Sequence, residues 1–138
     1  MTHLTPFRAW HLGALDVQPE QAFTRSLMSH DYAEAHEGNA MTALIDGKPV
    51  ACAGIAEFEG VLVAWAVLGV DAKPAMLAAT RACDAVLGKA GRDVFTMVRE
   101  GFAEGERWIR LLGFERTDDE AKRMPDGRHY LTWVRRHG

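Results

Sequence analysis

Residues 61–68 read Val-Leu-Val-Ala-Trp-Ala-Val-Leu, eight apolar residues in a row. A strand that is apolar on both faces is typical of the middle of a sheet with helices on both sides. Glu59-Gly60 forms a turn before this stretch, and Lys73-Pro74 opens a helix after it, where a missing proline N–H costs little. We therefore expect residues 61–70 to form the central strand of an α/β domain.

Upstream of the central strand the sequence predicts a β-hairpin. Residues 40–45 and 50–57 are strand-like, and Asp46-Gly47 between them supplies the positive φ angles that tight hairpin turns need. Before the hairpin we expect a short first strand over Phe7–Leu12. Two helices should follow it, over residues 20–28 and 31–37.

Downstream, helices and strands alternate. The last helix should place Trp108, Leu111 and Leu112 inward, with Arg107 and Arg110 outward. The elements expected here are a helix over 75–87, a strand over 93–99, a helix over 104–112, and strands over 114–117 and 128–134. Together the elements predict a single α/β domain over residues 1–138, a mixed sheet with helices on both faces.

Composition and charge exclude several classes of protein. The chain has 138 residues, of which 48% are hydrophobic and 25% charged, as in ordinary globular domains. A formal net charge of −3 argues against binding to nucleic acid. The longest nearly uncharged stretch, Gly60–Val70, is too short to span a membrane, and residues 1–10 lack a secretion signal. We expect a cytoplasmic protein.

Neither the cysteines nor the histidines form a recognisable metal site. Cys52 and Cys83 lie 31 positions apart without a CxxC motif, and their small, apolar neighbours predict buried thiols. The densest group of ligand-type residues is His30, Asp31, Glu34, His36 and Glu37. It lacks HExxH spacing, so we interpret it as a solvated acidic helix and expect no metal.

Three segments together resemble the GNAT (acyl-CoA N-acyltransferase) fold family. They are the hairpin through Asp46–Gly54, the strand ending in Trp65-Ala-Val-Leu-Gly69, and Arg107-Trp-Ile-Arg-Leu-Leu-Gly-Phe114. Within that family, Trp65–Asp71 and Arg107–Phe114 are most similar to the acetyltransferase-like internal virion or morphogenesis proteins of short-tailed phages. The resemblance implies a GNAT-like fold, acetyl-CoA or another acyl-CoA as cofactor, and a phage or prophage origin.

The resemblance also implies where the cofactor would bind. Backbone groups of Leu68 and Val70 would hold the pantetheine arm. The turn and helix start at Lys73, Ala75 and Met76 would hold the pyrophosphate, which helix N-termini favour. The family's turn is glycine-rich, whereas residues 70–77 contain no glycine and include Asp71 and Pro74. The expected CoA binding is therefore weakened.

Two functions remain open from the sequence. The tyrosine that serves as the family's general acid aligns with Ile109, which has no proton to donate. The resemblance identifies no catalytic base, and the candidates for that role are Glu57 and Glu59, at the turn before the central strand. The first function is an acyl-CoA-dependent N-acyltransferase with an amine or protein substrate. The second is a non-enzymatic phage protein, in the virion or in its assembly, that binds a protein partner. An enzyme needs an opening between the central strand and the 93–99 strand. In a binding protein, side chains such as Trp65 or Met76 would plug it.

Overall fold

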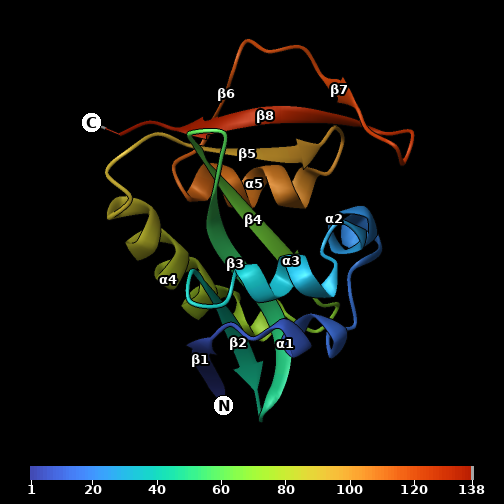
Figure 1. The fold of residues 1–138 in the computed structure, drawn as a ribbon, viewed down its shortest axis with the longest axis vertical. Helices are drawn as coiled ribbons and strands as arrows, with labels where there is room; N and C mark the ends of the chain where they lie inside the picture. Colours follow the sequence, from blue (N-terminus) through green and yellow to red (C-terminus); the bar gives the residue numbers. More distant parts are fainter. Residues whose placement is uncertain (138) are drawn as a thin grey trace.

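The computed structural model describes residues 1–137, whose strands form one mixed eight-stranded sheet (Figure 1). All neighbouring strands are antiparallel except β4 and β5, which are parallel. This confirms the predicted fold class. Across the sheet the strands are β1 (Thr2–Pro6), β2 (Ala40–Ile45), β3 (Lys48–Phe58), β4 (Val61–Leu68), β5 (Val94–Arg99), β8 (His129–Arg135) and β6 (Glu115–Arg116), and β7 (Lys122–Arg123) also pairs with β8.

Helices cover both faces of the sheet. Val67 of β4 packs in a core with residues from the N-terminal helices, whereas its neighbour Leu68 packs on the opposite face against the residues around η2. The N-terminal helices are α1 (Ala9–Gly13), η1 (Pro19–Gln21), α2 (Ala22–Ser26) and α3 (His30–Ala35), and those on the other face are η2 (Lys73–Ala75), α4 (Met76–Gly88) and α5 (Ala103–Leu111). β4 is central, as its apolar run predicts.

The predicted hairpin is confirmed. Asp46 and Gly47 have φ angles of 49° and 83° and join β2 to β3 in a two-residue turn. The turn from β3 to β4 has the same character, with Glu59 at 51° and Gly60 at 81°. Both pairs of positive φ angles match the right-handed twist of the flanking strands.

Two details of the prediction are wrong. The first strand is β1, over residues 2–6, and the expected strand over Phe7–Leu12 is largely the short helix α1. Ala9 and Leu12, three residues apart, are both buried there, which is helical spacing. In α5, Leu111 is 73% exposed because it follows Arg107 by four residues on the outer face, whereas Ile109 is buried.

The parallel strands β4 and β5 diverge soon after they meet. Their register includes only Leu62 with Val94 and Val63 with Phe95. The Thr96 hydroxyl donates to the Ala64 carbonyl at 3.0 Å, just beyond the last pair. In Figure 1, β4 runs down beside β3 while β5 crosses the top of the view beside β8. The two strands therefore separate after two residue pairs, which is the arrangement that the acyltransferase hypothesis requires.

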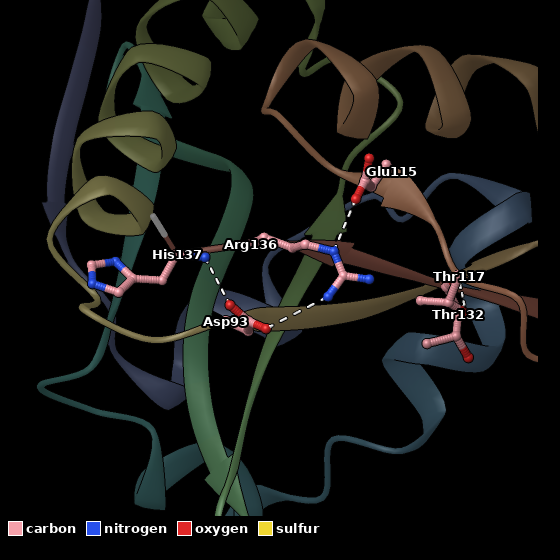
Figure 2. Close-up of polar contacts among 6 residues, drawn as sticks. All are labelled: Asp93, Glu115, Thr117, Thr132, Arg136 and His137. Atoms are coloured by element: carbon pink, nitrogen blue, oxygen red, sulfur yellow. Dashed lines mark hydrogen bonds and ion pairs between the residues drawn. The ribbon is translucent and has the colours of Figure 1, made fainter.

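Pairing with β8 fixes the direction of β5. All six residues of β5 pair with β8. Two contacts join the residues after β8 to neighbouring segments. Asp93, directly before β5, accepts from the His137 N–H at 2.7 Å, and the Arg136 Nε donates to Glu115 of β6 at 3.0 Å (Figure 2). Because these contacts hold β5 against β8, its separation from β4 is a property of the sheet rather than a frayed end.

Two histidines are buried in the core beneath the N-terminal helices. The Nδ1 atom of His11 accepts from the Arg8 N–H at 3.0 Å and lies 2.7 Å from the Thr42 hydroxyl oxygen. The His36 ring lies 5.4 Å from that of Trp65. Burial lowers the pKa of both histidines from the ordinary 6.5.

Candidate active site

A cavity of about 280 Å³ lies where β4 and β5 diverge. It extends between the two helical layers: Phe23 of α2 and Leu27, directly after α2, line one side, and Cys83 of α4 and Trp108 of α5 line the other. Trp65 of β4 lines the cavity without filling it, and Met76 is not among its lining residues. Apolar side chains form most of the wall, as in sites that bind organic ligands.

The β4 backbone presents hydrogen-bonding groups to this cavity at Ala66. Along an antiparallel pair, backbone groups point alternately toward and away from the partner strand. The Gly69 N–H donates to the Val50 carbonyl of β3 at 2.7 Å, so Gly69 faces β3. Counting back, Leu68, Ala66 and Ala64 face away from β3. The β4–β5 ladder ends before Ala66, so its N–H and C=O face the opening.

The other two outward-facing residues of β4 already have partners. The Ala64 carbonyl accepts from Thr96, as described above. The Leu68 N–H donates to the Gln21 Oε1, and the Leu68 carbonyl accepts from the Gln18 N–H at 2.9 Å. Residues 16–21 therefore lie along the end of β4, and Glu20 and Gln21 of this segment line the cavity. Ala66 is left as the position where an extended ligand could pair with the strand.

The turn after β4 offers few free donors. The Val70 N–H donates to the Asp16 carbonyl at 2.7 Å, and the Ala75 N–H to the Ala72 carbonyl at 2.8 Å. The Met76 N–H donates to the Lys73 carbonyl. The backbone N–H groups predicted for the cofactor at Leu68, Val70, Ala75 and Met76 are thus all used within the protein. Lys73 is exposed at the start of η2.

The charges around this turn oppose one another. The Lys48 Nζ lies 2.9 Å from Asp71 Oδ2, and this hydrogen bond lowers the pKa of the Asp71 carboxyl and raises the pKa of Lys48. The second oxygen, Asp71 Oδ1, is buried without a hydrogen-bond partner. A carboxylate at this position repels a bound phosphate. The opening at Ala66 therefore fits a pantetheine arm, whereas the turn does not fit its pyrophosphate.

Two charged side chains line the cavity among the described residues, Glu20 and Arg99. Glu20 belongs to η1, between Gln18 and Gln21, which fix this segment to β4. Arg99 ends β5, with its guanidinium 5.7 Å from the centre of the Phe102 ring. Within residues 1–137 neither Glu20 nor Arg99 forms an ion pair within 4.0 Å. Both are half-buried and available to a ligand.

Tyr130 brings a hydroxyl to the same side of the cavity as α2. Its ring lies 5.7 Å from that of Phe23, and its hydroxyl donates to Asp126 at 2.7 Å. Burial, together with this hydrogen bond, raises the pKa of Tyr130 to about 12. The hydroxyl therefore keeps its proton at neutral pH.

The carboxylates predicted as bases lie elsewhere. Glu57 and Glu59 are exposed at the β3–β4 turn, next to the paired start of β4, and neither lines the cavity. The Glu57 carboxylate lies 3.4 Å from Arg92. Their role as bases stays a prediction. Ile109, at the position of the family's tyrosine, does line the cavity and is buried.

Sequence reasoning did not identify Glu20, Arg99 or Tyr130. Glu20 follows a helix-starting proline, and Arg99 and Tyr130 lie in ordinary strands, so no local motif distinguishes them. The one available signal was topological. Residues at the carboxyl end of the strand after the central one must lie beside the opening, and Arg99 is the last residue of that strand.

The remaining candidate residues are the group around His30 and the two cysteines, of which Cys83 lines the cavity. Within residues 1–137 no three His, Cys, Asp or Glu side chains are grouped as metal ligands, and His30 pairs instead with Glu34 at 2.5 Å. Burial raises the pKa of both Cys52 and Cys83 to about 11, which keeps their thiols protonated. No described helix is long and apolar enough to cross a membrane.

The fold is shared with solved acetyltransferases. No protein-family model and no curated protein sequence matches the chain. Ard1 from Thermoplasma volcanium superposes with a TM-score of 0.74 at 16% identity, covering 98% of this chain and 97% of that one. The ribosomal-protein-S18-alanine N-acetyltransferase from Escherichia coli gives 0.71 at 18% identity, over 97% of this chain and 92% of its own.

A GNAT-family acetyltransferase from Streptococcus pneumoniae covers the whole of both chains, with a TM-score of 0.72 at 11% identity. Identities this low support the fold and leave the reaction to be argued from the site. The chain therefore has the fold of the GNAT acyl-CoA N-acyltransferases.

Proposed function

We propose that this protein is an N-acyltransferase that moves an acyl group from a thioester to an amine. The observation that supports this most directly is the cavity between β4 and β5, into which Ala66 directs a free N–H and C=O. These two groups can pair with the amides of a pantetheine arm and hold the thioester in the opening. Holding two reactants in one cavity is a large part of what such a reaction needs.

The reaction assigns a task to the chain's own residues. The amine nitrogen forms a bond to the thioester carbonyl carbon, the carbon–sulfur bond breaks, and the thiolate leaves and is protonated by solvent. The proton released by the amine needs an acceptor. Glu20 is the carboxylate that lines the cavity, so we propose Glu20 as that acceptor, directly or through water.

A second function has observations in its favour. Several N–H groups of the turn after β4 already have acceptors, and Ile109 aligns with the family's acid. Both features are expected in a protein that no longer catalyses acyl transfer. Such a protein would use the fold to bind a protein partner, as in phage virion assembly. It predicts that the cavity binds no thioester.

Thermal unfolding with ligand separates the two functions. At about 100 times its Kd, a ligand of the folded state adds about 2.7 kcal/mol, which corresponds to a rise of about 9 °C for this chain length. We expect such a rise with acetyl-CoA, and release of free thiol when primary amines are added. The variant Ala66→Leu should lose both effects because it fills the opening. Ala85→Leu on the exposed face of α4 should keep both. No rise with the wild-type protein would refute the acyltransferase.

A further inference from the structure

We propose that the acyl donor is recognised through its acyl-pantetheine arm alone, so that a nucleotide at the far end of the arm contributes nothing to binding. The donor class is then an acyl group on a pantetheine or phosphopantetheine thiol, with or without a nucleotide attached. This inference rests on the proposed function and specifies its donor substrate.

The first support is the hydrogen bonding of the turn. A pyrophosphate is held in such folds by several N–H groups that converge on it from a turn and a helix start. Here the Gly69 N–H is used by Val50 at 2.7 Å, the Val70 N–H by Asp16 at 2.7 Å, and the Ala72 N–H by Gly69 at 3.2 Å. Pro74 has no N–H. The N–H groups of Gly69, Val70 and Ala72 are therefore not free to bind a phosphate.

The start of the helix adds little. Because the 3-10 turn η2 precedes α4, the N–H groups of Ala75 and Met76 are satisfied by carbonyls three residues earlier. In a helix without such a turn these groups would be free at the N-terminus. The 3-10 turn thus removes two of the N–H donors with which a helix start attracts anions.

The second support is the charge at the turn. Asp71 points one oxygen at Lys48 and buries the other without a partner. Because Lys48 and Asp71 form an ion pair with no net charge, Lys48 offers no unpaired positive charge to a pyrophosphate. Lys73 is the remaining cation, and it is exposed, where a single ion pair contributes little.

The turn is also held in place from two sides. The bond from Gly69 joins it to β3, and the bond from Val70 joins it to the segment that contains Glu20. A side-chain carbon at Gly69 would meet the Val50 carbonyl at 2.9 Å, which shows how closely the two strands approach. Freeing the N–H groups of Gly69 and Val70 for a phosphate would break these two hydrogen bonds.

The pantetheine half of the site has none of these obstacles. Ala66 keeps its backbone groups directed into the cavity, and the wall around them is apolar. The two ends of the donor therefore meet different surroundings. The arm meets the apolar cavity at Ala66, and the nucleotide meets the turn after β4, where several N–H groups and Lys48 already have partners.

Calorimetric titration compares the two ends. We would titrate the protein with acetyl-CoA, with S-acetylpantetheine, and with adenosine 3′,5′-bisphosphate. The inference expects Kd values for the two thioesters within about threefold of each other and no binding of the nucleotide. The variant Ala66→Leu should weaken both thioesters equally, and its unfolding temperature shows whether it folds.

Two other outcomes overturn the inference in different ways. If acetyl-CoA binds ten times more tightly than S-acetylpantetheine, or if the nucleotide competes with it, the turn recognises phosphate. The donor inference is then wrong while the acyltransferase stands. If neither thioester binds, the proposed function itself fails, and the inference falls with it.

Discussion

The substitution Thr96→Val tests how the opening between β4 and β5 is held. The ladder between these strands ends at Val63 and Phe95, so the next carbonyl of β4, Ala64, takes its hydrogen bond from the Thr96 side chain. Valine has nearly the same shape as threonine and lacks only the hydroxyl. The change therefore removes one hydrogen bond and leaves the Ala64 carbonyl without that partner.

The magnitude follows from what the carbonyl loses. A neutral hydrogen bond contributes about 1 kcal/mol net, and a buried acceptor left unpaired costs about 1–3 kcal/mol. With an unfolding entropy of about 2.1 cal/mol/K per residue, 1 kcal/mol corresponds to roughly 3–4 °C for this chain. We expect Thr96→Val to lower the unfolding temperature by about 3–10 °C.

Thr117→Val supplies a matched control. The Thr117 hydroxyl also donates to a backbone carbonyl, that of Thr132, at 3.2 Å, but the Thr117 N–H donates to the same oxygen at 3.1 Å (Figure 2). That carbonyl keeps a partner after the substitution, so the loss should stay below about 2 °C. Calorimetric unfolding of both variants gives the comparison. If Thr96→Val costs no more than Thr117→Val, the hydroxyl does not hold the two strands where they part.

Two further predictions concern titratable groups. Glu20→Gln should lower kcat/KM for acyl transfer by about 10²-fold or more if it accepts the amine proton. Glu57→Gln should change it less than about threefold, and the reverse order in a thiol-release assay would restore the hairpin carboxylate as the base. Because burial lowers the pKa of His11 and His36 below 6.5, the unfolded chain binds protons more readily and stability should fall as the pH drops below 6.5. The slope can reach about 1.4 kcal/mol per pH unit for each histidine, and an unfolding temperature that stays flat from pH 7 to pH 5 would contradict this.

The fold was predictable because its signals are local and strong. The apolar run at residues 61–68 indicates a central strand, and the Asp46-Gly47 turn fixes the hairpin before it. Errors arose where short elements carry weak periodicity. Residues 7–12 mix polar and apolar positions, and tertiary packing places Ala9 and Leu12 together in a helix. The two-residue strand β7 offers too few residues for any pattern to indicate it.

The candidate site was less predictable because its residues meet only in the folded sheet. Glu20 and Arg99 are 79 positions apart, and they line one cavity because η1 is fixed to the end of β4 while β5 follows β8. The weak turn was visible from its missing glycines. The sequence could not show that the N–H groups of this turn already have acceptors, because the acceptors of Gly69 and Val70 lie in β3 and before η1.

The two halves of the expected donor site depend on different physics, so one can persist without the other. The channel at Ala66 is made of backbone groups and of the angle between two strands, which the β5–β8 pairing fixes. Side-chain changes in the turn leave that angle unaltered. A phosphate site, in contrast, requires free N–H groups and unpaired cations, and Pro74, η2 and the Lys48–Asp71 ion pair each reduce their number. The geometry for an acyl arm can therefore persist where the geometry for a nucleotide is weakened.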